Sequence, residues 1–211
     1  MTKHAMSKLK ARLNDAPHLR TRAPGRQGLY DPAFEHESCG VGFVADIKGR
    51  KSHQTIRDAL QVLLNLNHRG ACGSEANTGD GAGILLQTPH QFLERAAADA
   101  GVTLPGPGKY GVGMVFLPRD PAQRRGCQRL FEVIVAQEGQ EALGWRAVPT
   151  DNSMIGATAK ASEPFVSQVF IRRNPNLADD MAFERKLFVI RKRAVREIRN
   201  SGLKGSHYWY M

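Results

Sequence analysis

The stretch Glu37-Ser38-Cys39-Gly40-Val41-Gly42-Phe43 decides how this chain is organised. Residues 1–38 are polar, basic and interrupted by proline and glycine, and the periodic patterns of a packed domain begin after them. Cleavage of the peptide bond before Cys39 would place a thiol and a free α-amino group on one residue. An α-amino group has a pKa of roughly 7.7–8.0, so a base would lie beside the nucleophile near neutral pH. We therefore interpret residues 1–38 as a leader and Cys39 as a candidate catalytic nucleophile.

The cysteine content limits the other chemistry that this chain can perform. Most cysteines are small buried hydrophobes, and this remains the alternative for Cys39. The three cysteines, Cys39, Cys72 and Cys127, are widely spaced and form no Cys-x-x-Cys pair. This pattern argues against a zinc site or a disulfide framework. It is typical of a reducing, cytoplasmic compartment.

The net charge of +10 raises the hypothesis of a nucleic-acid-binding protein. Basic residues concentrate in the N-terminal tail and in residues 185–199, but neither segment interleaves them with aromatic residues as a single-strand binder does. A solvated charged surface is therefore favoured over nucleic-acid binding. No apolar run approaches the roughly 18 residues that cross a membrane, and residues 1–38 lack the apolar region of a secretion signal. We expect no membrane partner.

Hydrophobic periodicity predicts one α+β domain over residues 39–211, behind the leader. Helices are expected at 52–66, with Ser52 as the N-cap, and at 90–100, 121–137 and 179–200. The last helix should bury Met181, Phe183, Leu187, Ile190, Ala194 and Ile198. Strands are expected at 40–47, 84–86, 110–117, 144–148 and 165–171, with another beginning at 206–211, and residues 150–161 read as irregular.

The glycine-rich segment Thr78-Gly79-Asp80-Gly81-Ala82-Gly83 is not a nucleotide-binding loop. It lacks the lysine of a phosphate loop, and a helix precedes it where a dinucleotide fingerprint needs a strand. It is either a structural turn or the wall of a pocket, since glycines allow a substrate to reach the backbone. Arg69 also has two interpretations: it interacts with a helix dipole, or it lowers the pKa of the Cys39 thiol.

Three stretches together resemble the start of the glutamate synthase large subunits, whose first region is a class II glutamine amidotransferase domain. They are Cys39-Gly40-Val41-Gly42-Phe43, His68-Arg69-Gly70-Ala71 and Thr78-Gly79-Asp80-Gly81-Ala82-Gly83-Ile84. Each motif alone is weak, but three in order at matching separations are specific. The similarity runs from about Asp31 to the last residue, and further support comes from Val115-Phe116-Leu117-Pro118 and from Gly144-Trp145-Arg146 before Val148-Pro149.

The resemblance implies an N-terminal-nucleophile αββα sandwich with antiparallel sheets, incomplete in this chain. It implies removal of residues 1–38 and attack by Cys39 on the side-chain amide of glutamine, giving a thioester, ammonia and then glutamate. Arg69, Gly70, Asp80 and Gly81 would line the glutamine pocket, and no metal is expected.

The resemblance also implies features of a longer protein. Ammonia would pass to a synthase domain that carries FMN and an iron–sulfur cluster and converts 2-oxoglutarate to a second glutamate. The partners are then glutamine and the remainder of the synthase chain, and the resemblance allows a small electron-transfer subunit. No cofactor is expected in residues 1–211 themselves.

One departure from the family pattern affects the expected activity. In this family an Asn-Gly pair forms the oxyanion hole, and a downstream Arg and Asp hold the glutamine; this sequence contains no Asn-Gly pair. We expect an N-terminal piece with little or no glutaminase activity alone, since one lost oxyanion donor costs about 10²–10³ in rate. Two alternatives stay open: another N-terminal-nucleophile amidotransferase, which Thr78–Gly83 disfavours, and a non-enzymatic basic nucleic-acid-binding module.

Overall fold

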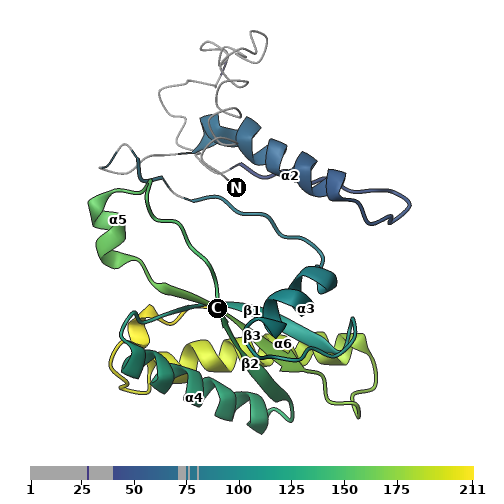
Figure 1. The fold of residues 1–211 in the computed structure, drawn as a ribbon, viewed down its shortest axis with the longest axis vertical. Coiled ribbons are helices and arrows are strands. Elements are labelled where there is room, and N and C mark those ends of the chain that lie inside the picture. The colour runs from purple at the N-terminus through teal and green to yellow at the C-terminus, as the bar shows by residue number, and fades with distance from the viewer. Residues whose placement is uncertain (1–27, 29–39, 71–74, 76, 80) are drawn as a thin grey trace. The chain divides into compact units, whose positions relative to one another are not determined.

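The computed structural model describes residues 28, 40–70, 75, 77–79 and 81–211, with the side chains of Arg69 and Tyr208 left out (Figure 1). The chain divides into two compact units, residues 1–41 and 42–211. Every helix and strand below lies in the second unit.

The second unit alternates helices with three strands. In chain order its elements are α2 (His53–Asn65), η2 (Leu66–Arg69), α3 (His90–Ala98), β1 (Tyr110–Leu117), α4 (Pro121–Gln137), β2 (Glu141–Ala147), α5 (Ala157–Ser162), β3 (Phe165–Arg172), α6 (Asp180–Arg199) and η3 (Ser206–Tyr208). These bounds confirm the four predicted long helices and the predicted strands at 110–117, 144–148 and 165–171, within a few residues.

Side-chain caps explain where the long helices begin. Ser52 Oγ accepts a hydrogen bond from the backbone N–H of Gln54 at 3.1 Å, as predicted for the N-cap of α2. An aspartate caps α4 and α6 in the same way, with Asp120 and Asp179 each accepting from the backbone N–H three residues later. Such a cap satisfies one of the backbone donors that a helix start leaves without an intrahelical partner.

The three strands form one antiparallel sheet in the order β1-β3-β2. The register of β1 on β3 runs without interruption from Tyr110↔Arg172 to Leu117↔Phe165. The pairing of β2 on β3 shifts between Ala142 and Gly144, and Gly144 has φ 151°. Glycine takes this conformation without the steric cost that a side chain would add.

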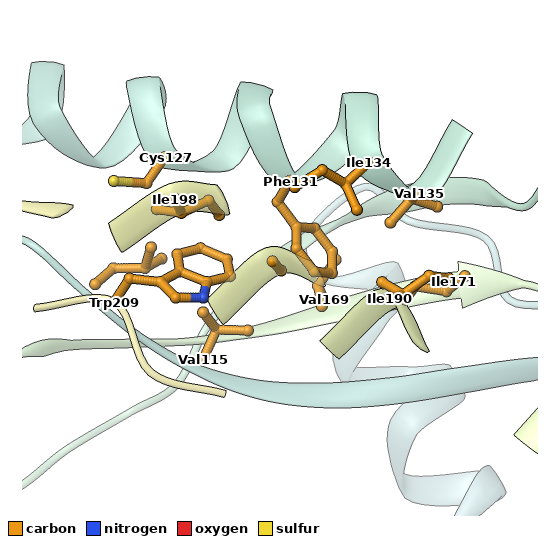
Figure 2. Packing of buried hydrophobic residues seen from close by; sticks show 12 residues of the cluster. Val115, Cys127, Phe131, Ile134, Val135, Val169, Ile171, Ile190, Ile198 and Trp209 are labelled. Atoms are coloured by element: carbon orange, nitrogen blue, oxygen red, sulfur yellow. The ribbon is translucent and has the colours of Figure 1, made fainter. Parts of the chain in front are cut away.

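Alternate residues of the sheet face two separate hydrophobic clusters, because side chains of a strand alternate between its faces. On one face, Val115, Leu117, Val169 and Ile171 pack against α4 and α6, which lie side by side (Figure 1). Figure 2 shows the Phe131 side chain pointing from α4 toward the strands. The buried members of this cluster are Val115, Leu117, Cys127, Phe131, Ile134, Val135, Val169, Ile171, Ile190, Ala194, Ile198 and Trp209.

The other face of the sheet packs against α3. Tyr110 and Phe170 join Leu93 and Ala97 of α3 in a second buried cluster, which Val102 and Leu104 complete. The described residues thus form a mixed arrangement of helices and an antiparallel sheet, as predicted, with helices on both faces.

An ion-pair group joins α4 to α6 beside the first cluster. The Glu138 carboxylate, at the end of α4, accepts hydrogen bonds from Lys186 Nζ at 2.9 Å and from Arg193 Nη1 at 2.6 Å. These bonds, Lys186 first and then Arg193, hold the pKa of Glu138 below its ordinary value. Its carboxylate side chain is only 13% exposed, so solvent screens this group weakly.

The predicted strand at 40–47 is wrong. Residues 40–46 form no helix or strand, and Val41, Phe43 and Ile47 are exposed by 94%, 92% and 103%. Alternating hydrophobicity does not make a strand unless a neighbouring strand satisfies its backbone groups, and none in the described part of the chain does so. Close packing against α2 explains the glycine at position 42, because a Cβ there would lie 2.6 Å from Val62 Cγ1.

Four further local predictions need correction. Residues 84–86 form no strand, and Leu85 is fully exposed. The segment predicted as irregular contains the short helix α5. The predicted strand at 206–211 is the 3-10 helix η3, followed by a single bridge between Phe116 and Tyr210. Met181 is 58% exposed, although Phe183, Ile190, Ala194 and Ile198 are buried on α6 as predicted and Leu187 is partly buried.

Candidate active site

The residues predicted for the site fall into described and undescribed groups. Cys39 and Asp80 lie outside the described residues, and so does the side chain of Arg69. Gly70 and Gly81 are described. The grouping of these five residues around one pocket therefore stays a prediction.

The His68-Arg69-Gly70 motif lies where a helix ends. α2 tightens into the 3-10 turn η2, which ends at Arg69, and Gly70 then takes an extended conformation with φ −82° and ψ 141°. The Gly70 N–H donates to the carbonyl of Asn67 at 3.2 Å, and His68 Nδ1 lies 2.9 Å from the carbonyl oxygen of Asn65. The motif thus lies at a helix exit.

The backbone conformation at Gly81 explains why this position is a glycine. Its φ of 100° lies in the left-handed region, which a residue with a Cβ rarely adopts. A Cβ built there would meet no atom within 4 Å, so the backbone conformation, and not crowding, demands glycine. Whether the segment forms the wall of a pocket stays a prediction.

The start of the glycine-rich segment is tied to the segment before α5. Asn77 Nδ2 donates to the carbonyl of Met154 at 3.3 Å, and Thr78 Oγ1 accepts from the Gly156 N–H at 3.1 Å. Glu75 Oε1 accepts from the Thr158 N–H at 3.1 Å. This last bond is the largest cause that lowers the pKa of Glu75. We call these contacts the 75–158 tether.

Glu75 was not among the residues predicted for the site, although Thr78 belongs to a predicted motif. Glu75 carries no local signal, because the backbone N–H that donates to it lies 83 residues away. The contact between Glu75 and the start of α5 is visible only in the three-dimensional structure.

Two cavities lie among the described residues, and neither is lined by a predicted site residue. The larger, about 260 Å³, is lined by Arg119, Asn152 and Glu163 among others. Its polar groups already pair with one another: Glu163 Oε2 accepts from Arg119 and, at 2.8 Å, from Asn152 Nδ2. The second cavity, about 210 Å³, lies beside His90 and Tyr110. Neither cavity therefore marks the glutamine site that the motifs predict.

Two other features, a metal-ligand cluster and a membrane-spanning helix, are absent from the described part of the chain. No group of three or more His, Cys, Asp or Glu residues there could hold a metal ion. No helix there is long and apolar enough to cross a membrane.

The helix-exit motif and the tethered glycine-rich segment lie within a sequence whose family can be assigned. The sequence pattern of Glutamine amidotransferases class-II matches residues 39–211, starting at the candidate nucleophile. The chain belongs to this family.

Individual relatives narrow the similarity to one kind of enzyme. The chain is 45% identical over 171 residues to the glutamate synthase [NADPH] large chain of Bacillus subtilis, covering 81% of this chain and 11% of that protein. It is 39% identical over 199 residues to glutamate synthase [NADH] of Saccharomyces cerevisiae (88% and 9%). It is 39% identical over 165 residues to the chloroplastic ferredoxin-dependent glutamate synthase of Spinacia oleracea (78% and 10%). The chain thus spans about a tenth of the length of these relatives.

Proposed function

We propose that this chain is the glutamine amidotransferase part of a glutamate synthase that hydrolyses glutamine to glutamate and ammonia, and that residues 1–211 alone have little or no such activity. One observation carries the proposal: the family match spans residues 39–211 and begins at Cys39, the candidate nucleophile. The similarity to glutamate synthase large chains, at up to 45% identity in the three relatives above, supports the choice of enzyme.

The proposed reaction uses the thiol and the α-amine of Cys39, freed by removal of the leader, residues 1–38. The amine takes the thiol proton, and the sulfur attacks the carboxamide carbon of glutamine. The carbon–nitrogen bond breaks, ammonia leaves with a proton from the α-ammonium group, and a thioester remains. Water then cleaves the thioester, which releases glutamate and restores the thiol.

The pocket in this proposal is formed by Arg69, Gly70, Asp80 and Gly81. The extended backbone at Gly70 and the left-handed backbone at Gly81 support it, because both leave main-chain groups uncovered by a side chain. The surrounding domain would be an αββα sandwich. The helices on both faces of an antiparallel sheet are consistent with that fold.

In the longer protein that we propose, the ammonia serves the reductive amination of 2-oxoglutarate in a cytoplasmic enzyme. FMN and an iron–sulfur cluster would supply the electron transfer there. The residues of this chain do not fit the cluster, since Cys127 is buried in the first hydrophobic cluster and Cys39 is the proposed nucleophile, which leaves Cys72 alone. These groups, and the contacts with a small electron-transfer subunit, are therefore assigned to other parts of the protein.

The test uses the full-length polypeptide and two cysteine variants. Cys39→Ala should lower glutamine hydrolysis by about 10³-fold or more, because the nucleophile is lost. Cys127→Ala, at a buried thiol in the first cluster, should leave the rate of the folded enzyme unchanged. Intact mass should show a chain that begins at Cys39 and takes up one equivalent of a glutamine-like electrophile. Normal turnover by Cys39→Ala would refute the proposal.

A further inference from the structure

We propose that Glu75 is a positioning residue for the glutamine site: its carboxylate fixes the glycine-rich segment 78–83 on the backbone of residues 156–158. This inference rests on the proposed function, since it assigns a role to a residue beside the proposed pocket. It goes beyond that function because Glu75 belongs to none of the residues predicted to touch glutamine.

The Glu75 carboxylate uses both oxygens to join the two segments. Oε1 accepts from the Thr158 N–H, and Oε2 accepts from the Thr78 hydroxyl, both at 3.1 Å. The Thr78 oxygen in turn accepts from the Gly156 N–H at 3.1 Å. The Thr78 N–H also donates to the Glu75 carbonyl at 3.0 Å, which closes a turn. The Glu75 carboxylate thus binds Thr78, the first residue of the glycine-rich segment, and also the backbone at the start of α5.

The local structure of α5 makes this carboxylate important. α5 has six residues, its N-cap Gly156 has no capping side chain, and isolated helices of this length are marginal in water. The first N–H groups of a helix need acceptors, and a negative charge is favourable there. Glu75 supplies that acceptor and that charge from outside the helix.

Gly156 provides the space for this contact. A Cβ added at Gly156 would collide with the Glu75 carboxylate. The backbone at Gly156 has φ −70°, which any residue can adopt, so crowding alone requires glycine. A substitution at Gly156 therefore perturbs the tether from the opposite side without removing the carboxylate.

The segment that follows has a particular need for an anchor. Glycine loses more conformational freedom on ordering than any other residue, so a segment with glycines at 79, 81 and 83 is costly to hold in one conformation. The tether fixes Thr78, immediately before the first of these glycines. Loss of the tether would free Thr78, and with it the start of the glycine-rich segment that the proposed function places at the glutamine site.

The experiment compares four variants of the full-length polypeptide. Glu75→Ala removes the acceptor, Glu75→Gln keeps an acceptor oxygen, and Gly156→Ala displaces the carboxylate. Glu184→Gln, at an exposed carboxylate on α6, is the matched control. Hydrogen exchange reports on the amides of residues 77–83 and 156–158, and steady-state kinetics give kcat and KM for glutamine.

Glu75→Ala and Gly156→Ala should each speed exchange in both segments about tenfold and raise KM about tenfold with kcat nearly unchanged, since a charge-assisted hydrogen bond is lost. Glu75→Gln should recover most of both effects, and Glu184→Gln should match the unmodified protein. Unchanged exchange in Glu75→Ala would overturn the inference. So would faster exchange spread equally over β1 and β3, or faster local exchange with an unchanged KM. Failure of the proposed function would be visible separately, as turnover that survives Cys39→Ala.

Discussion

Replacement of Phe131 by alanine should strongly destabilise the domain. Phe131 is fully buried on α4, and its ring centroid lies 5.5 Å from that of Trp145 and 5.4 Å from that of Trp209. Burial between two aromatic rings and the strands leaves little room for the site to collapse (Figure 2). A Phe→Ala change in such a core costs about 3–5 kcal/mol of the free energy of unfolding.

The assay for this prediction is urea unfolding of the 211-residue chain, followed by tryptophan emission. The chain contains two tryptophans, and both contact Phe131, so the signal reports this cluster directly. With a urea m-value of about 2 kcal/mol/M, a loss of about 4 kcal/mol lowers the midpoint by about 2 M. The matched control is Phe188→Ala on α6, where the side chain is 56% exposed, and its midpoint should barely move. Equal shifts for the two variants would refute the packing argument.

Three further predictions concern local features. Gly144→Ala should cost about 1–3 kcal/mol in urea unfolding, because its φ of 151° is unfavourable for alanine and a Cβ would lie 2.6 Å from Val102 Cγ2. Because the pKa of Glu138 is lowered in the folded state, this carboxylate stabilises the fold above the ordinary carboxyl pKa and loses that effect as pH falls through its folded pKa. Glu138→Gln should therefore reduce the fall of the urea midpoint between pH 6 and pH 3. Burial raises the pKa of the Cys127 thiol, so a thiol reagent at pH 8 should reach it only after unfolding, and Cys127→Ala should lack that late-reacting equivalent.

The elements that the sequence predicted best are those whose signals are local. α4 begins and ends at the predicted residues, because Asp120 caps it and its apolar spacing continues to Gln137. β1 also has the predicted bounds, since its Val-rich and Phe-rich run ends at Pro118. In both cases neighbouring residues alone decide the backbone conformation.

The elements that the sequence mispredicted depend on distant residues. Segment 40–47 alternates like a strand but has no pairing strand in the described part of the chain, and alternation says nothing about a partner. α5 is too short to show a helical period, and its start is capped by Glu75 from 82 residues before Ala157. The order β1-β3-β2 could not be read from the chain either, because β1 pairs with β3 and not with β2, the next strand along the chain.

The candidate site was predictable only as a set of motifs. The φ of Gly81 shows a backbone conformation that side chains disfavour, but its place in the glutamine pocket stays a prediction. The roles of Cys39, Arg69 and Asp80 came from the family resemblance and stay predictions. The support under the glycine-rich segment could not be predicted, since it joins two parts of the chain that have no shared pattern.

The carboxylate at the end of α4 has a consequence for how the core can respond to mutation. Lys186 and Arg193 are seven residues apart, about two turns or 10 Å along α6, yet both reach Glu138. Two ion pairs at different heights on α6 favour one translation and one rotation of this helix on α4. An enlarged side chain in the core beneath them therefore has to strain these pairs or be accommodated by the sheet.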